Sequence, residues 1–446
     1  MTGNEDTIYA ASTAGLPAAI AIIRISGPKT RFVIETMAGS CPTPRFASYR
    51  TIRKPEDQSP IDRGLVLWFP GPDSFSGEDS GEFQVHGGPA VVAAMLEALS
   101  GIPGLRMAEP GEFTYRSFLN GKMDLTAVEG LADLISAETE SQRRQALRQG
   151  EGRLGALYES WRKRIVKARA MIEAELDFAD EEDVPGSVST RIWPDLAALA
   201  EDIRLHLDSS GKARTLRSGI SVVLQGRPNA GKSSLLNALS KRDAVIVSDE
   251  AGTTRDVVTV NMDLGGYLFS ISDTAGIREA GSAIEAEGVR RALAAGETAD
   301  LVIWLQGPDE SDVTEAGVSR DDVPVWIVAS KGDLIDSDTQ RSFGSADLTL
   351  SAKTGAGLPE LEAKLIEYAG TVCGTGMEDL ATRGRHVEEL RKSLLSLDTA
   401  LAGDAMPIEV RAEDLRRASD ALGRLTGRID VEDLLDVIFS EFCVGK

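Results

Sequence analysis

Cysteine is scarce in this sequence, and the few cysteines lie too far apart in the chain to share a metal ion. Cys41, Cys373 and Cys443 are the only three among 446 residues, and none has the spacing of a zinc motif. An odd and sparse set of thiols provides no disulfide framework and suits a reducing compartment. We therefore expect a cytoplasmic protein.

Long hydrophobic runs and targeting signals are also lacking. The longest purely aliphatic run, Ala18 to Ile23, is far shorter than the roughly 20 residues that span a bilayer. The first residues, Met1 to Asp6, have neither the basic start of a secretory signal nor the Arg-rich, acid-poor composition of a transit peptide. We expect no membrane association.

Basic residues are fewer than acidic residues in this sequence. The chain has 48 Lys and Arg against 70 Asp and Glu, which gives a formal net charge of −22. Non-specific binding to nucleic acid needs a basic surface, so this balance opposes it. If the protein serves RNA, we expect a partner to carry much of the phosphate contact.

A phosphate-binding loop is the clearest feature that the sequence does contain. Gly226 to Ser233 reads G-x-x-x-x-G-K-S, between an apolar strand pattern at Ile220 to Leu224 and a helical pattern at Ser234 to Leu239. Backbone N–H groups of such a loop and of the helix N-terminus form an anion site. The predicted GTP-binding residues here are Asn229, Ala230, Gly231, Lys232, Ser233 and Ser234, with Lys232 on the β- and γ-phosphates and the Ser233 hydroxyl on Mg²⁺. Alone, the octet would also fit an ATPase.

Two further motifs fit a γ-phosphate and its Mg²⁺. Asp273-Thr274-Ala275-Gly276 follows the strand pattern Tyr267 to Ser272, and its carboxylate can reach Mg²⁺ through water. Gly252 to Asp256 is a polar loop, in which Thr254 is placed to complete the Mg²⁺ shell.

Two motifs select the base. Ser330-Lys331-Gly332-Asp333 ends the apolar strand pattern Val325 to Val328, and Asp333 can accept from both guanine N1–H and N2–H. Adenine has no such pair of donors, so a carboxylate at this position rejects it. Ser351-Ala352-Lys353 is expected to close the base pocket. Guanine motifs commonly begin with Asn, and Ser330 loses the amide that ties the loop to the P-loop, so we expect weaker affinity with guanine specificity retained.

The periodicity divides the chain into an α/β part, two helical parts and a nucleotide domain. Residues 1–120 read as a small α/β domain, with strands at Ile20 to Ile25, Leu65 to Phe69 and Glu82 to His86 and a helix at Ala90 to Leu99. His86 stands alone there, which favours a structural role over a catalytic one. Residues 217–372 alternate strand and helix patterns as in a doubly wound sheet.

Helical stripes flank the nucleotide domain on both sides. Apolar residues recur at three- and four-residue steps from Leu154 to Leu207 and again from Val387 to Leu425. Because helices with a single apolar stripe need partners, we expect residues 121–216 and 373–446 to build one helical domain into which the nucleotide domain is inserted.

Taken together, the chain resembles one family, MnmE (also called TrmE), the tRNA-modification GTPases. The residues that carry the match are Ile22 to Gly27, Phe69 to Pro72, Gly77 to Asp79, His86 to Pro89, Pro110 to Thr114, Leu119 to Leu125, Gly226 to Ser233, Ala251 to Asp256 and the ending Cys443-Val444-Gly445-Lys446. The combination of an internal P-loop with a Cys-x-Gly-Lys ending makes the match specific.

The resemblance implies a homodimer that binds a one-carbon folate of the 5-formyl- or methylene-tetrahydrofolate type in its N-terminal domain. By match, Arg24, Glu82, Lys122 and Lys446 are folate-site residues, and Cys443 acts near that site as either a catalytic or a structural thiol. With an FAD-dependent partner, MnmG (GidA), in a heterotetramer, the family adds a carboxymethylaminomethyl or aminomethyl group to C5 of the wobble uridine of certain tRNAs.

The resemblance also supplies a mechanism of hydrolysis. Ile277 stands where many small GTPases have a water-orienting Gln, and no arginine finger is evident. In the family, paired G domains hold K⁺ where the finger would be, with Glu285 matching the residue that orients water. By match, the K⁺ ligands are Asn229, Ser248, Glu250 and Thr253, and the GTP-binding loop comprises Ser248, Asp249, Glu250, Ala251, Gly252, Thr253 and Thr254. The alternative function is a ribosome-assembly or regulatory GTPase switch, which lacks the folate domain and this ending.

Overall fold

The computed structural model of the chain forms two compact units, each built from segments that are distant in the sequence. The structure describes residues 6–177, 189–241, 245–246, 258–273, 299–308, 323–334, 346–374, 379–402, 406–429, 435, 438–440, 442 and 444–445. The first unit comprises Met1–Ala132, Gln149–Leu199 and Lys392–Lys446, and the second comprises Asp133–Arg148 and Ala200–Arg391.

The first unit contains a six-stranded sheet with helices on one face. The strand order is β3-β4-β5-β2-β1-β6. The bounds are β1 Thr7–Ala11, β2 Ala18–Ser26, α1 Thr30–Ala38, β3 Ser48–Arg53, β4 Pro60–Phe69, β5 Ser80–Gly87, α2 Pro89–Ser100 and β6 Leu105–Met107. Since side chains alternate along a strand, Ile23 and Ile25 of β2 join the core with Val33, Ile34 and Met95 of the two helices. Arg24 and Glu82 point to the other face.

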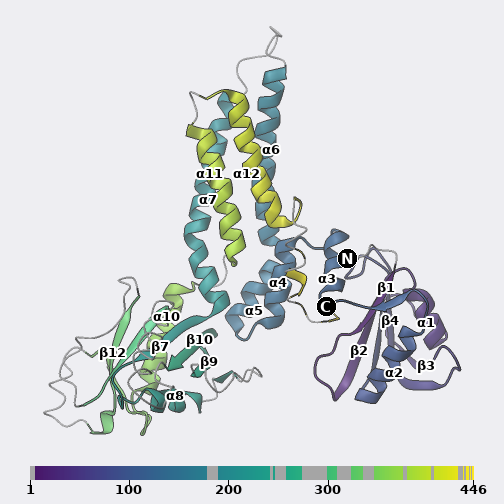
Figure 1. Ribbon diagram of the computed structural model, residues 1–446, viewed down its shortest axis with the longest axis horizontal. Coiled ribbons are helices and arrows are strands. Elements are labelled where there is room, and N and C mark those ends of the chain that lie inside the picture. The colour runs from purple at the N-terminus through teal and green to yellow at the C-terminus, as the bar shows by residue number, and fades with distance from the viewer. Residues whose placement is uncertain are drawn as a thin grey trace, which may run out of the picture. The chain divides into compact units, whose positions relative to one another are not determined.

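Helices continue the first unit. They are α3 Glu112–Leu119, α4 Leu125–Ser136, α6 Arg153–Asp177, the start of α7 Ser189–Ser218, the end of α11 Gly384–Ala402, and α12 Ile408–Thr426. The apolar stripe of α6 packs against α12, so helices from before and after the nucleotide-binding segment lie side by side (Figure 1). Phe439, from beyond α12, is fully buried in a cluster with Leu125 and Val128.

A seven-stranded sheet forms the centre of the second unit, with the order β13-β12-β11-β7-β10-β9-β8. The bounds are α5 Glu140–Gly150, β7 Ile220–Gln225, α8 Lys232–Ser240, β8 Val245–Ile246, β9 Val258–Leu264, β10 Tyr267–Asp273, β11 Leu301–Gln306, β12 Val325–Ala329, a short 3-10 turn at Gly332–Leu334, β13 Leu348–Thr349 and α10 Leu358–Val372. Five neighbouring strands of this sheet run parallel to one another, namely β13, β12, β11, β7 and β10. Strand β9 pairs antiparallel with β10.

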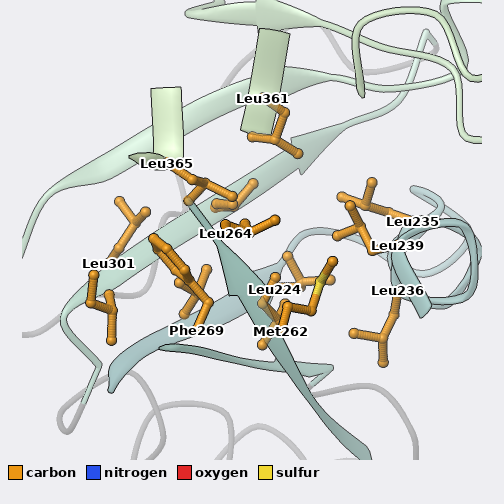
Figure 2. Packing of buried hydrophobic residues seen from close by; sticks show 14 of the residues in the cluster. Leu224, Leu235, Leu236, Leu239, Met262, Leu264, Phe269, Leu301, Leu361 and Leu365 are labelled. Atoms are coloured by element: carbon orange, nitrogen blue, oxygen red, sulfur yellow. The ribbon is translucent and has the colours of Figure 1, made fainter. Parts of the chain in front are cut away.

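Apolar side chains from both kinds of element hold this sheet together. Leu224 and Phe269 come from neighbouring strands, and Leu236 and Leu365 come from α8 and α10 (Figure 2). The fully buried strand residues alternate less than in the first unit because helices pack on a parallel sheet from both sides. Burial of this cluster fixes the strand ends at which the polar motifs lie.

The expected fold class is confirmed, with both the α/β and the helical parts present. Every strand and helix that the periodicity predicted exists, and most are longer by one to four residues at their ends. Elements that the sequence reasoning did not identify include β1, α1, β3, β13 and α10. Among the described residues, no helix has the length and apolar character needed to cross a membrane.

Candidate functional site: a nucleotide site and an N-terminal cavity

Four polar segments meet at one edge of the seven-stranded sheet. They follow β7, β10, β12 and β13, which are parallel strands, so their carboxyl ends share an edge. In open α/β sheets, ligands bind outside these ends. The predicted P-loop, Asp273, the segment starting at Ser330 and the segment starting at Ser351 therefore converge.

The backbone of the P-loop takes conformations that require glycine. Gly226 has φ 140°, and a Cβ there would lie 2.4 Å from the carbonyl oxygen of Leu305. Gly231 has φ 99° and is the N-cap of α8. Asn229, with φ 64°, is the one described residue of the loop that takes a left-handed conformation without being glycine. The chain thus turns sharply from β7 into α8 and leaves the helix N-terminus facing the strand edge.

Lys232 and Ser233 begin α8 beside the end of β10. Lys232 is 6% exposed, and its ammonium donates to the carbonyl oxygens of Gly226 and Arg227 at 2.7 and 3.0 Å, so the side chain lies across the P-loop. The Ser233 hydroxyl donates to Oδ2 of Asp273 at 2.7 Å. A hydroxyl and a carboxylate therefore meet where the sequence predicted Mg²⁺.

Ser330 connects the predicted base-recognition segment to the P-loop. Its hydroxyl donates to the Ala230 carbonyl at 2.6 Å, and its backbone N–H donates to the Gln306 carbonyl at 2.8 Å. The side chain is 3% exposed. The hydroxyl that serine keeps thus makes a connection to the P-loop without the amide, and the expected weaker affinity stays a prediction.

Asp333 lies on the surface of this edge and is oriented by Ser351. The Ser351 hydroxyl donates to Oδ1 of Asp333 at 2.6 Å, while the Ser351 backbone N–H donates to the carbonyl of Ala356. The hydrogen bond from Ser351 lowers the pKa of the Asp333 carboxyl from its ordinary value of 3.8, so the group stays an acceptor. Lys331, with φ 55°, turns the chain between Ser330 and Asp333.

Several predicted site residues lie outside the described residues. They are Ser248, Asp249, Glu250, Ala251, Gly252, Thr253, Thr254, Thr274, Ala275, Gly276, Glu285, Cys443 and Lys446. Their assignments remain predictions.

A second candidate site lies in the first unit, on the sheet face opposite α1 and α2. A cavity of about 280 Å³ is lined by Arg24, Arg45, Phe69, Asp73, Ser74, Phe75, Ser76, Ser80, Glu82 and Phe113. Arg24 and Glu82 are register partners on β2 and β5 and form an ion pair of 3.2 Å. The Arg24 guanidinium lies 5.6 and 5.8 Å from the ring centroids of Phe75 and Phe113. Lys122 is exposed and does not line this cavity.

The end of the chain reaches this N-terminal part. Val444 forms an isolated β-bridge with Pro110, and the Gly445 carbonyl accepts from the Ser12 hydroxyl at 2.9 Å. Gly445 has φ 98°, and a Cβ there would lie 2.6 Å from the Ala11 carbonyl oxygen. Val444 and Gly445 are therefore held close to the N-terminal α/β part of the chain.

Most of the residues that line the cavity carry no recognisable signal in the sequence. Phe75 and Phe113 come from segments where only short motifs were noticed, and Ser76 and Ser80 carried no motif at all. The one available signal was the alternation of β5, which puts Ser80 on the same face as Glu82. The exposed His86 ring contacts Asp62 at 3.0 Å and lies outside the cavity lining.

Family models match almost the entire chain. The model of the GTP-binding protein TrmE N-terminus matches residues 7–122, and that of the MnmE helical domain matches residues 125–443.

Curated relatives match over their full length. The tRNA modification GTPase MnmE of Brucella anthropi is 50% identical over 99% of this chain and 98% of its own length. That of Rhizobium etli is 51% identical over 99% of both. A solved structure, Aquifex aeolicus Era bound to GDP and AlF4−, is 26% identical over 33% of this chain and 56% of that chain, with a TM-score of 0.27.

Proposed function

This chain belongs to the MnmE family of tRNA modification GTPases, and we propose that it modifies C5 of the wobble uridine of certain tRNAs. The GTP-hydrolysing activity comes with membership in the family. The observation that supports it in this chain is the convergence of Lys232, Ser233, Asp273, Ser330 and Asp333 at one strand edge.

Different described residues of the site bind the phosphates and the base of GTP. The P-loop N–H groups and Lys232 bind the phosphates, because a helix N-terminus and an ammonium together compensate their charge. Asp333, held by Ser351, accepts the two N–H groups of guanine. Ser330 keeps the base segment in register with the P-loop. This arrangement orients the β–γ bond before hydrolysis.

A hydroxyl and a carboxylate oxygen are donors that suit Mg²⁺, and Ser233 and Asp273 bring them together at 2.7 Å. When bound there, Mg²⁺ neutralises charge that develops between the β- and γ-phosphates. We assign Ser233 and Asp273, with Thr254 from the loop before β9, to hold it.

Potassium-dependent hydrolysis by paired G domains is part of the proposal. Asn229, at the outer turn of the P-loop, is the one member of the K⁺ ligand set within the described residues, and Ser248, Glu250 and Thr253 complete that set. A monovalent cation between two domains would supply the charge that an arginine finger supplies elsewhere. Glu285 would orient the attacking water.

The N-terminal cavity is the proposed folate site. Glu82 suits the N–H groups of a pterin, and Arg24 and Arg45 suit the carboxylates of a glutamate tail. Lys446 belongs to the proposal by resemblance, and the described residue before it, Gly445, accepts a hydrogen bond from Ser12. The one-carbon folate would carry the carbon that is added to uridine. Lys122 and Cys443 are assigned by resemblance alone.

The proposed assembly is a homodimer that joins an FAD-dependent partner, MnmG, in the cytoplasm. The net charge of −22 supports a partner that carries much of the tRNA contact. Together they would add a carboxymethylaminomethyl or aminomethyl group. Family membership and the N-terminal cavity favour this over a ribosome-assembly or regulatory switch.

Reconstitution tests the proposal. The purified chain, MnmG, substrate tRNA, GTP and methylene-tetrahydrofolate are incubated in KCl with glycine or an ammonium salt as the source of the amino group. The nucleosides of the tRNA are then analysed by mass spectrometry. We expect a modified wobble uridine that requires all components. Formation of the product without folate, or its absence in the complete mixture, would overturn the proposed chemistry.

Removal of Lys446 supplies the matched control for the folate site. We expect the shortened chain to lose 5-formyltetrahydrofolate binding and to keep GTP hydrolysis. Equal folate affinity of the two proteins would show that the terminal lysine has no part in the site.

A further inference from the structure

A chain of buried hydroxyl groups leads from the wall of the N-terminal cavity to a carboxylate behind it. The oxygens of Ser80 and Ser76 are 3.0 Å apart, and those of Ser76 and Ser26 are 2.7 Å apart. The Ser26 hydroxyl donates to Oε2 of Glu78 at 2.9 Å. Ser26, Ser76 and Ser80 are 0%, 1% and 7% exposed. Only Ser76 and Ser80 of these four residues line the cavity.

The sheet register explains why the serines meet. Ser26 of β2 lies opposite Ser80 of β5, two residues beyond the pair formed by Arg24 and Glu82. Because side chains two residues apart share a face, all four point away from α1 and α2. Ser76 lies in the loop that precedes β5, and its hydroxyl contacts the hydroxyls of both Ser26 and Ser80.

Glu78 fixes the polarity of the chain at its inner end. Its carboxylate accepts from the guanidinium of Arg116 at 3.1 Å, and Arg116 is 3% exposed. Arg116 also pairs with Asp6 and Glu112, at 2.6 and 3.0 Å. A carboxylate in an ion pair can only accept hydrogen bonds. Ser26 must therefore donate its single hydroxyl proton to Glu78.

The remaining directions follow from one proton per hydroxyl. Since Ser26 donates to Glu78, the short contact between Ser26 and Ser76 requires Ser76 to donate. Ser76 then has no proton left, so Ser80 donates to Ser76. The weaker alternatives for Ser80, the Ser26 oxygen at 3.4 Å and the Glu78 carbonyl at 3.3 Å, also direct its proton inward. In every case Ser80 turns lone pairs, and no proton, toward the cavity.

We propose that this hydroxyl chain makes Ser80 an obligatory acceptor, so that the inner wall of the cavity selects a ligand edge that carries N–H donors. Ser80 and Glu82 are two residues apart on the same face, and both accept. Two adjacent acceptors match neighbouring ring N–H and amino groups of a heterocycle such as a pterin. The inference rests on the proposed folate site and adds the residues that determine which edge of the ring enters.

The variant Glu78→Gln tests the polarity without changing the shape of the side chain. A glutamine amide beside Arg116 turns its oxygen to the guanidinium and its NH₂ to Ser26. Ser26 then donates to Ser76, Ser76 donates to Ser80, and Ser80 presents its proton to the cavity. Two donors would face each other in the complex, because the ligand edge also carries N–H groups.

The measurement is the affinity of the full-length chain for 5-formyltetrahydrofolate by calorimetry. We expect Glu78→Gln to weaken binding at least about tenfold, as facing donors leave buried polar groups unsatisfied. Glu35→Gln is the matched control: it makes the same exchange at a carboxylate that pairs with Arg31 on α1 and lies outside the cavity lining. We expect this control to change affinity less than about threefold.

Ser76→Ala supplies an independent arm, because it breaks the chain in the middle. With Ser76 absent, only the weaker 3.4 Å contact links Ser26 to Ser80, so Glu78→Gln reverses Ser80 far less and its effect in the double variant should fall below about threefold. GTP hydrolysis and thermal unfolding of each variant report whether the fold is intact. Additive losses from the two substitutions would overturn the inference in favour of a purely structural network.

The two failures can be told apart. If the unchanged chain does not bind the folate, the proposed function fails and this inference fails with it. If the unchanged chain binds and Glu78→Gln binds equally well, only the polarity argument is overturned.

Discussion

The Ser330 hydroxyl donates a hydrogen bond of 2.6 Å to the backbone carbonyl of Ala230, which joins the segment predicted to recognise guanine to the P-loop. The two residues are 100 positions apart in the chain. A serine can replace the usual asparagine here because the end of β12 approaches the P-loop closely enough for a shorter side chain. The base segment and the phosphate segment are thus positioned as one unit.

Ser330→Ala should weaken GTP binding by roughly fivefold to thirtyfold, since it removes a buried hydrogen bond and leaves the Ala230 carbonyl without this donor. Fluorescent GTP titration gives the affinity. Ser330→Cys, which is close in size and is a weak donor, should fall between the two proteins. An alanine variant with unchanged affinity would mean that the contact positions nothing.

Asp333→Asn should shift the base preference from guanine to xanthine. The amide offers one donor and one acceptor, which matches the O2 and N–H of xanthine, whereas the carboxylate offers two acceptors. Competition between GTP and xanthosine triphosphate measures the shift. A variant that still prefers GTP would remove Asp333 from the base site.

Ser351→Ala should make GTP binding more sensitive to acid. The Ser351 hydroxyl lowers the pKa of Asp333, so the carboxylate stays ionised at a lower pH than an ordinary aspartate does. Its contribution is present above the ordinary value and is lost as the pH falls through the lowered pKa. In the alanine variant this loss should begin at a higher pH. GTP affinity, measured stepwise at pH values where circular dichroism shows a folded chain, decides; coincident profiles would contradict the prediction.

Asn229 should control the response to the alkali cation. We expect GTP hydrolysis to be much faster in KCl than in NaCl at equal ionic strength, and variants at Asn229 to lose this difference. Both salts screen charge alike, so screening cannot cause it. Because residue 229 has φ 64°, alanine there is strained, and Asn229→Gly separates loss of the amide from backbone strain. A glycine variant that keeps the K⁺ response would show that Asn229 is only a turn residue.

Gly445→Ala should release the tail from the N-terminal part. An added Cβ would lie 2.6 Å from the Ala11 carbonyl oxygen, and φ 98° is unfavourable for alanine. We expect folate affinity to fall by about tenfold or more, since strain of about 1–3 kcal/mol opposes docking. GTP hydrolysis should be unchanged. Val444→Ala, at a half-exposed side chain, is the control and should bind folate normally. Equal binding by Gly445→Ala would separate the tail from the folate site.

The sequence by itself determined the chemistry of the nucleotide site and the family. Gly226 to Ser233 is contiguous, so the turn, the anion site and the lysine follow from local backbone preferences and need no knowledge of distant contacts. Asp333 was likewise predicted from its residue type and motif, because two acceptor oxygens match the N1–H and N2–H donors of guanine. Strong strand and helix periodicities likewise fixed the order of the larger elements, because burial of one face is a local signal.

The contacts between residues that are far apart in the sequence were decided only by the tertiary structure. The Ser330–Ala230 bond was not predicted, because the approach of β12 to the P-loop depends on how the sheet is assembled. The cavity lining and the serine chain to Glu78 could not be predicted from the sequence, because they depend on strand register. The register places Ser26 opposite Ser80, and it is set by long-range pairing rather than by local preference.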